Sequence, residues 1–390
     1  MTILNMVTAG GWWEPMTMTI VWDEVSNPSN FFVKYDDDAA WLTQWSTDFD
    51  TFFWYSAVLL DNDWNEVEEV AQSSPWVLDM SSFNWALTWT ANNVMIKFPR
   101  RWIKMSKSGS QVTLSLTKEV NKPWYQYYAF TKWNTSRAFM YLWAYKWTFS
   151  NDNSTVASSF TSWTTYMKSW ATWTKTLNFS PCACQNIVNM RATAAKYGNW
   201  YSLSTIYPRW YIDCLYMLKY GNPDSQGIIW PWYTWNGGAS VAPWLTNSIT
   251  NATWNTDNTS NWRIKLFWLE DWWGNVSDMT DGCYFDENKN LTVDKTNSIF
   301  QSSAYSTNLW VASSWYMKTI DWSNDGMFRN TSDTAWSWTT YYADNSGAGN
   351  SRALRIGGGY GTYSSGGIFS VSPTSPSYAE ESYGARLMYL

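Results

Sequence analysis

The chain has 390 residues, of which 26 are basic and 32 acidic, so its formal net charge is −6. This length allows two or three domains with a sizeable core, and a negatively charged chain without a basic run is a poor partner for nucleic acid. The sequence contains no histidine, which excludes histidine-based metal sites and the nucleophile–histidine pairs of many hydrolases. We therefore expect no enzyme of these classes and no bound cofactor.

The first 84 residues predict a small β-rich domain. Short apolar or alternating runs cover 16–22, 31–35 and 52–60, and a turn follows at 61–65. Beyond this domain, 94–98 and 111–117 alternate apolar and polar residues on either side of a turn at 107–110. We predict that these two runs pair as a hairpin.

Two helices are predicted, within 182–197 and 208–220. The second has amphipathic spacing at Ile212, Leu215 and Tyr216 and ends at Gly221, a residue type common at helix C-termini. Residues 147–180 are predicted to form a long polar surface loop, and residues 222–262 are predicted to form a second polar loop. The stretches 263–300 and 311–390 predict short strands joined by turns. The predicted fold class is α+β, with few helices and no internal repeat.

The cysteines and the N-terminal residues say little about a site. Cys182, Cys184, Cys214 and Cys283 lack the C-x-x-C spacing of zinc and redox sites and are too few for a disulfide framework, although one bridge stays open. No apolar run reaches the roughly 18 residues of a membrane span. The first basic residue is Lys34, too late for the positive start of a signal peptide. We expect no membrane insertion and no export signal of the usual kind.

Tryptophan is the anomaly of the composition. The chain contains 34 Trp and 20 Gly, whereas glycine makes up about 7% of an average protein. Several Trp follow Asn or Asp at predicted turns, where a positive φ favours glycine; these are Trp64, Trp200, Trp262 and Trp322. One hypothesis is that such codons are UGA, read as glycine in the native organism and written here as tryptophan. The alternative is an unusually aromatic protein whose indoles fill cores or stack on sugars.

Three stretches of the chain resemble a known family. Residues 263–276 end in Gly274-Asn275-Val276 and are followed by Asp278 and Asp281-Gly282. This pattern resembles the Gly-Asn-Val core of formylglycine-generating-enzyme-like proteins, and 352–359 and 384–387 are similar to the last two motifs of that family, in the same order. The resemblance implies a C-type-lectin-like domain over 85–390, preceded by the β-rich domain of 1–84.

Two upstream segments, 93–102 and 121–129, are similar to parts of phage tail and prophage structural proteins. By that resemblance a glycine is expected at Trp102, Trp124 and Trp268. In the enzyme branch of the family a cysteine pair near the C-terminus carries the chemistry, and this chain has no cysteine after Cys283. The resemblance therefore implies a non-enzymatic scaffold that displays a ligand-binding face, as in phage tails and in the variable proteins of diversity-generating retroelements. A formylglycine-generating-like enzyme and a purely structural virion subunit are the alternatives.

The predicted binding face lies in 339–379. Retroelement mutation of AAY codons never yields Lys, Glu, Gln, Met or Trp, and this segment contains none of the five, although all 34 Trp precede it. A Tyr/Ser/Gly-rich loop that lacks these residues by composition is the alternative. In both cases the residue types suit an adaptable binding surface, and we predict ligand contacts at Tyr341, Tyr342, Asp344, Asn345, Tyr360, Thr362, Tyr363, Ser364, Ser365 and Phe369.

The expected partner is a cell-surface protein or glycan. The expected location is a virion tail or a cell surface, and the cytoplasm before assembly. A tail protein is expected to form a homo-oligomer such as a trimer. Two further patterns are interpreted as structural. Asp61, Asp63 and Asn65 imitate a calcium loop, but the loop's later ligand positions do not match, so a solvated hairpin turn is favoured. No spacing identifies a catalytic carboxylate pair, and we expect loop-holding roles for Glu270, Asp271, Asp278 and Asp281.

Overall fold

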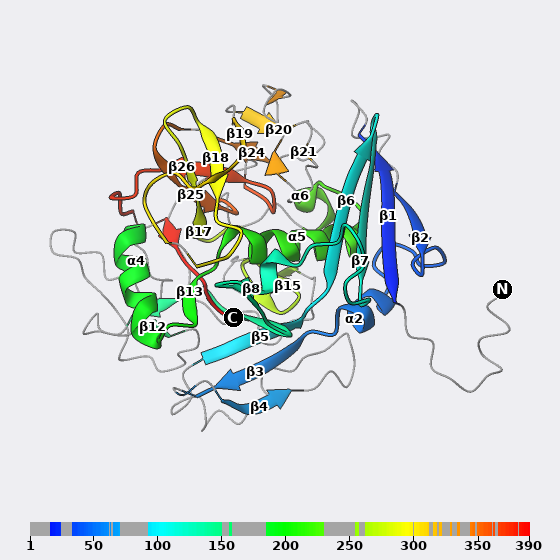
Figure 1. Cartoon of the computed structure of the whole chain (residues 1–390), viewed down its shortest axis with the longest axis horizontal. Helices are drawn as coiled ribbons and strands as arrows, with labels where there is room; N and C mark the ends of the chain where they lie inside the picture. The colour runs from blue at the N-terminus through cyan, green and yellow to red at the C-terminus, as the bar shows by residue number, and fades with distance from the viewer. Residues whose placement is uncertain are drawn as a thin grey trace.

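The structure is a computed structural model. It describes residues 16–24, 33–61, 63, 65–70, 93–149, 156–157, 185–229, 254–256, 262–298, 300–311, 315–317, 320–321, 328–329, 334–335, 344–347, 349–360, 362, 366–380 and 382–390. Figure 1 shows its sheets arranged around a central helix.

Four antiparallel strands form the first sheet, in the order β2 (Val33–Asp37), β1 (Thr17–Asp23), β7 (Gln111–Thr117) and β6 (Trp102–Ser108). Alternate side chains of β1 enter the core, as the two-residue period of a strand requires. Strands β6 and β7 form a hairpin whose turn contains Gly109 at φ 62°. The prediction of a hairpin at this turn is confirmed, but its first strand is β6.

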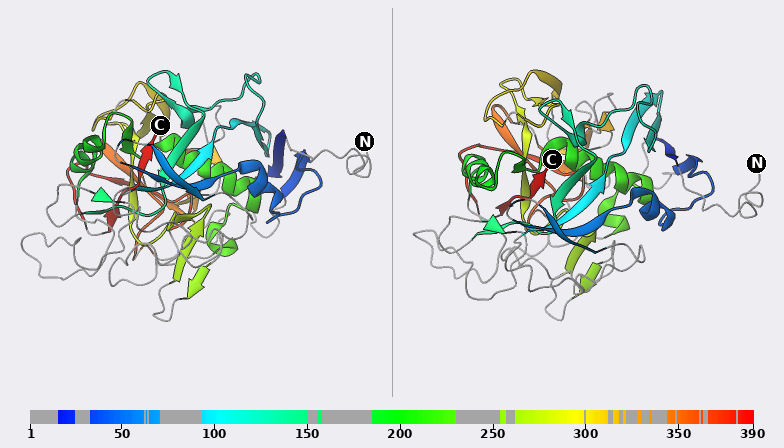
Figure 2. Two further views of the ribbon diagram at one scale, coloured as in Figure 1. Left: turned by 90° about the horizontal axis from the view of Figure 1, so that it is seen from below. Right: turned by 60° about the horizontal axis from the view of Figure 1, so that its bottom comes forward.

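The run that was expected to pair with 111–117 belongs to a second sheet. The order of this sheet is β13 (Tyr201–Leu203), β28 (Leu387–Tyr389), β10 (Phe139–Trp143), β5 (Asn93–Pro99), β3 (Ser56–Leu60) and β4 (Glu66–Val70). Figure 2 shows the red C-terminal strand beside the strands from the first half of the chain. Strands β1 and β2 lie in the first sheet with β6 and β7, and β3 and β4 lie in the second sheet with later strands. Both sheets therefore contain strands from before and after the predicted domain boundary at residue 84.

A third sheet contains most of the C-terminal strands. Its order is β19 (Thr307–Val311), β18 (Asn290–Val293), β17 (Ser277–Phe285), β25 (Arg352–Ile356), β26 (Val371–Thr374), β24 (Asn345–Ser346), β20 (Trp315–Met317) and β23 (Thr334–Ala335), with β27 (Tyr383–Gly384) parallel to β17. Smaller ladders join β8 (Thr131–Lys132) to β9 (Thr135–Ser136), β11 (Thr148–Phe149) to β12 (Val156–Ala157), β14 (Trp254–Thr256) to β15 (Trp262–Leu266) and β16 (Leu269–Glu270), and β21 (Ile320–Asp321) to β22 (Phe328–Arg329). Most of 147–180 and 222–262 lies outside the described residues.

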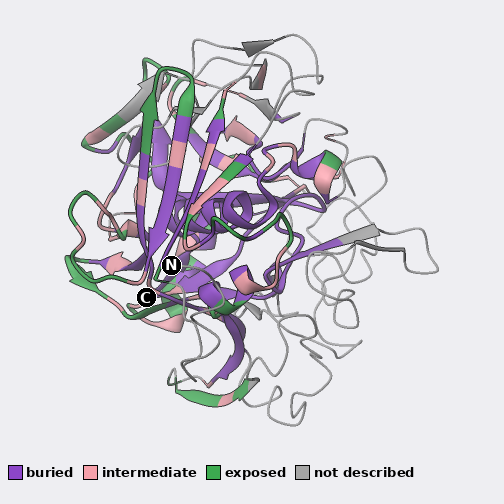
Figure 3. Cartoon of the chain, turned by 90° about the vertical axis from the view of Figure 1, so that its right-hand side faces the viewer, coloured by how far each residue is buried: buried purple, intermediate pink, exposed green. Residues whose placement is uncertain are grey.

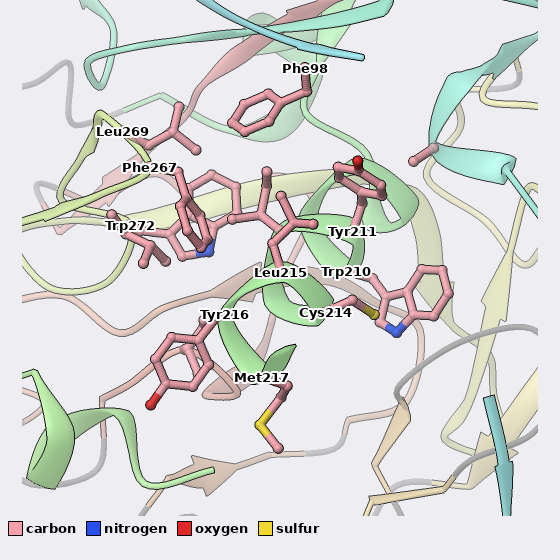
Figure 4. Close-up of a cluster of buried hydrophobic side chains, with 14 of the residues drawn as sticks. Phe98, Trp210, Tyr211, Cys214, Leu215, Tyr216, Met217, Phe267, Leu269 and Trp272 are labelled. Carbon is pink, nitrogen blue, oxygen red and sulfur yellow. The ribbon is translucent and has the colours of Figure 1, made fainter. Parts of the chain in front are cut away.

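The longest described helix, α5 (Ile206–Tyr220), lies inside the molecule. Every one of its residues is buried, so the expectation of an amphipathic helix is corrected to a helix covered on all sides (Figure 3). Its side chains point both toward Phe98 and Phe267 and toward the opposite side (Figure 4). The helix ends at Gly221, as predicted. The other helices in the described residues are α2 (Asp48–Phe53), η3 (Tyr128–Phe130), α4 (Ile187–Ala194), η4 (Ala195–Tyr197) and α6 (Ser225–Ile228).

The predicted fold class, α+β with a C-type-lectin-like domain, is contradicted. The described residues form a β-rich molecule with several antiparallel sheets and few helices. Many of these strands have only two to four residues, so they are too short to show a hydrophobic period in the sequence. Their formation depends on partner strands far along the chain rather than on local preference.

Candidate functional site

Asp278 is the centre of a buried charge cluster beneath the C-terminal loops. Its carboxylate lies 3.1 Å from Lys146 Nζ and 2.9 Å from Arg209 Nη1, and none of the three side chains is more than 3% exposed. Burial raises the pKa of Asp278, but the positive charges of Lys146, Arg386 and Arg209 outweigh burial and hold that pKa below its usual value. The cluster thereby joins β17 to α5 and to the segment after β10.

Arg386 connects this cluster to two backbone segments that are distant in sequence. Its guanidinium donates to the carbonyl oxygens of Trp143 at 2.5 Å, Ala144 at 2.9 Å and Glu270 at 2.5 Å. Buried carbonyl groups need such partners because no water reaches them. Burial lowers the pKa of Arg386 to about 10, so the side chain remains charged at neutral pH.

Arg209 and Trp272 extend the cluster toward Asp213. The guanidinium carbon of Arg209 lies 3.8 Å from the Trp272 ring centroid, a cation–π contact, and Arg209 also donates to the Trp272 carbonyl oxygen. The indole Nε1 of Trp272 in turn donates to Asp213 Oδ1 at 3.1 Å. Burial raises the pKa of Asp213 to about 7, and the charge of Arg209 only partly opposes that effect.

Shifted pKa values of this kind are also found in active sites. Here, however, the charged side chains of the cluster are at most 8% exposed, so a substrate has no access to them. Asp213, Asp278, Lys146, Arg209 and Arg386 therefore act as internal supports. Removing one partner of such a buried pair leaves the other charge uncompensated in the interior, which is strongly unfavourable.

Two of the neighbouring carboxylates, Asp271 and Asp281, also have the structural role that was predicted. Asp271 accepts a hydrogen bond from Asn275 Nδ2 at 2.9 Å. Asp281 receives two 2.7 Å hydrogen bonds from Arg191, which fixes α4 to β17. The carbonyl oxygen of Glu270 accepts from Arg386.

A loop over 357–370 rests directly on this charge cluster. Gly274 N donates to Gly357 O at 2.9 Å, Tyr360 N to Asn275 O at 2.8 Å, and Gly357 N to Ser370 O at 3.0 Å. Gly357 has φ 87°, and a Cβ atom there would lie 3.0 Å from Arg209 Nη2 and 3.0 Å from the Trp272 carbonyl oxygen. Only glycine allows the loop to approach its support this closely.

Asp344 fixes the other end of the loop. This fully buried carboxylate accepts from Phe369 N at 2.8 Å and from Gln226 Nε2 at 2.9 Å. Ser225, in the same short helix α6, accepts from Ile368 N at 3.0 Å. Burial raises the pKa of Asp344 well above its usual value. The loop is thus held at both ends by buried polar groups.

Some of the predicted contact residues lie on this loop and others beneath it. Tyr360 and Thr362 are half-buried, and Thr362 Oγ1 donates to Gly359 O at 2.7 Å. The ligand contacts predicted at Phe369 and Asp344 do not fit an exposed face, because Phe369 is 7% exposed and belongs to the core, and Asp344 is also buried. Asn345 lies in β24. The remaining predicted residues, Tyr341, Tyr342, Tyr363, Ser364 and Ser365, lie outside the described residues.

Several supports of the loop were missed in the sequence. Gln226 and Ser225 lie on a short helix far from the loop in sequence, and no local pattern connects them to it. The run Gly357-Gly358-Gly359 was the one available signal, because consecutive glycines often mark a close backbone approach.

The residues that imitate a calcium loop, Asp61, Asp63 and Asn65, belong to a hairpin turn, as predicted. Asp61 Oδ1 accepts from the backbone N of Asp63 and of Asn65, both at 2.8 Å. These bonds close the turn between β3 and β4. Within the described part of the chain, no group of three or more Cys, Asp or Glu is arranged to hold a metal ion.

The cysteines in the described residues are Cys214 and Cys283, and both are buried and free. Cys182 and Cys184 lie outside the described residues. Among the helices of the described part, none is both long and apolar enough to cross a membrane.

Comparison with known proteins assigns no family to this arrangement. No protein-family model and no curated protein matches the chain.

Proposed function

We propose that the chain is a non-enzymatic binding protein that contacts a cell-surface ligand through the loop at 357–370. The setting we propose is a phage tail, a prophage-derived tail, or a variable protein of a diversity-generating retroelement. The observation that supports the proposal most is the loop itself, which is held at both ends by buried groups and carries half-buried Tyr360 and Thr362 between them.

A rigid support lowers the entropic cost of binding, because buried groups hold both described ends of the loop before a ligand arrives. Tyrosine supplies a large amphipathic contact surface with few rotatable bonds. The composition of 339–379, rich in Tyr, Ser and Gly, fits the same purpose. Catalysis is not proposed, because the described groups with strongly shifted pKa values in the cluster beneath the loop are buried.

Attachment of the fluorescently labelled chain to intact host cells tests the proposal. We expect Tyr360→Ala to reduce attachment at least about tenfold, since aromatic anchors often contribute 2 kcal/mol or more to an interface. Tyr127→Ala is the matched control, because Tyr127 is 36% exposed and lies outside 339–379. Thermal unfolding of each variant separates loss of binding from loss of folding.

Two pretreatments of the cells identify the class of ligand. Protease treatment removes a protein ligand, and mild periodate oxidation removes a glycan ligand. A folded Tyr360→Ala variant that attaches as well as the unmodified chain would contradict the proposed loop.

A further inference from the structure

Tryptophan adopts the left-handed backbone conformation unusually often in this protein. Of the fourteen non-glycine residues with positive φ in the described part, five are tryptophan, more than any other type. They are Trp45 (φ 71°), Trp54 (φ 51°), Trp124 (φ 68°), Trp133 (φ 49°) and Trp268 (φ 64°). A positive φ is tolerated by glycine and sometimes by Asn or Asp, but for a bulky residue it is an outlier.

One of these tryptophans has a glycine counterpart elsewhere in the same chain. Trp54 ends α2 with φ 51°, and its N–H donates to Asp50 O at 2.8 Å. Gly221 ends α5 with φ 55°, and its N–H donates to Met217 O at 2.8 Å. Both residues form the same left-handed helix end, a position at which glycine predominates because it has no Cβ.

Trp124 occupies the glycine position of a β-turn. Tyr125 N donates to Lys122 O at 3.3 Å, so Pro123 and Trp124 are the two central residues. Proline at the first central position followed by a positive φ at the second is the signature of a type II turn. That second position calls for glycine, or else asparagine.

Two more of these tryptophans lie in two-residue hairpin loops. Trp133 and Asn134 connect β8 to β9, and both have positive φ. Phe267 and Trp268 connect β15 to β16, again both with positive φ. Such loops need a positive φ at both residues and are dominated by pairs of Gly, Asn and Asp.

One of the five tryptophans is buried and the other four are exposed. Trp268 is buried, at 1% exposed, whereas Trp54 is 61% and Trp124 is 88% exposed, and Trp45 and Trp133 also count among the exposed apolar side chains. An exposed indole gains little contact to offset an unfavourable backbone. Trp54 and Trp124 therefore have backbone strain without compensating burial. The rings of Trp45 and Trp133 lie 4.7 Å and 4.9 Å from the rings of Tyr220 and Trp200.

We propose that the native residue at these five positions is glycine, encoded by UGA and read by a glycine-accepting tRNA whose anticodon pairs with UGA. The positive φ angle supports this inference at these five positions only. Trp102, Trp200 and Trp262 are not among the described residues with positive φ, and Trp64 and Trp322 lie outside the described residues.

Peptide masses of the protein isolated from its native source test the proposal directly. Trypsin does not cleave between Lys122 and Pro123, so the peptide 119–132 contains Trp124 alone among tryptophans, and 133–137 contains Trp133 alone. We expect both peptides to have the mass with glycine. The peptide 210–219 is the control, because Trp210 is buried inside α5, where glycine is unfavourable, and it should keep its tryptophan. Tryptophan in the first two peptides would overturn the proposal.

Variants of the chain as written give a second, independent readout. We expect Trp124→Gly and Trp54→Gly to raise the melting temperature by a few degrees. Trp124→Ala and Trp54→Ala should raise it less, because alanine removes the exposed indole but keeps the Cβ that the left-handed conformation disfavours.

Gly109→Ala is the reverse control. Gly109 has φ 62°, and a Cβ atom there has no neighbour within 4 Å, so a lower melting temperature would report the backbone alone. Equal melting temperatures for the glycine and alanine variants at both positions would show that the backbone conformation is not strained, and the structural argument would fail.

Discussion

Gly367 lies directly against the buried carboxylate of Asp344. A Cβ atom at residue 367 would be 2.0 Å from Asp344 Oδ1 and 2.7 Å from its Cγ. The same carboxylate receives the backbone N–H of Phe369. The absence of a side chain at 367 therefore lets the loop at 357–370 reach its buried anchor.

The first prediction follows from this contact. Gly367→Ala should destabilise the protein by about 1–3 kcal/mol, the usual cost of overpacking a dense interior, as measured by denaturant unfolding. In an Asp344→Ala background the cost should fall, because the carboxylate that Cβ meets has been removed. Additive effects of the two substitutions would mean that residues 344 and 367 do not make this contact.

The second prediction concerns the buried charges. Asp278→Asn keeps the shape of the side chain but leaves Lys146 and Arg209 without their counter-charge, so we expect a loss of about 3–5 kcal/mol in the free energy of unfolding. The control is Asp36→Asn, whose partner Lys34 is 66% exposed; an exposed pair contributes about 0–1 kcal/mol. Similar losses for both variants would contradict an internal support at Asp278.

The third prediction is a pH dependence with a defined sign. The pKa of Asp213 is raised from 3.8 to about 7 by burial, so between these values the folded protein binds more protons at this site than the unfolded chain does. The contribution of Asp213 to stability is therefore complete below pH 3.8 and is lost as the pH rises through about 7. Its slope is at most about 1.4 kcal/mol per pH unit.

Asp213→Asn checks this dependence. The amide has no proton to gain or lose in this range and can still accept the hydrogen bond of Trp272. The stability of the variant should fall less steeply than that of the unmodified chain between pH 4 and pH 7. Parallel curves for the two proteins would show that Asp213 does not titrate as described.

The fourth prediction separates the two aromatic residues of the loop. Phe369→Ala should cost about 3–5 kcal/mol, because it empties a buried position, whereas Tyr360→Ala should cost much less and act on attachment instead. Calorimetric or denaturant unfolding of both variants measures the difference. A small loss of stability for Phe369→Ala would indicate that Phe369 lies on the exposed binding face instead.

Local chemistry was sufficient to predict some elements. The helix ending at Gly221 and the turn at Asp61 depend on neighbouring residues, and both are present in the structure. The partner of β5 was predicted wrongly, because a period of two identifies a strand and its faces but not the strand that pairs with it. The distribution of α5 side chains was also misjudged, since polar residues such as Arg209 and Asp213 are buried beside partners distant in sequence.

The sequence by itself determined the composition of the candidate binding segment, the anomaly of the tryptophans and the residues that turn or cap the chain. These depend on residue types and on spacings of a few positions. Only the tertiary structure decided that Asp344 and Phe369 are buried, that Arg386 meets Trp143 and Glu270, and which tryptophans have a positive φ. Such properties arise from contacts between residues far apart along the chain, and no local pattern encodes the partner.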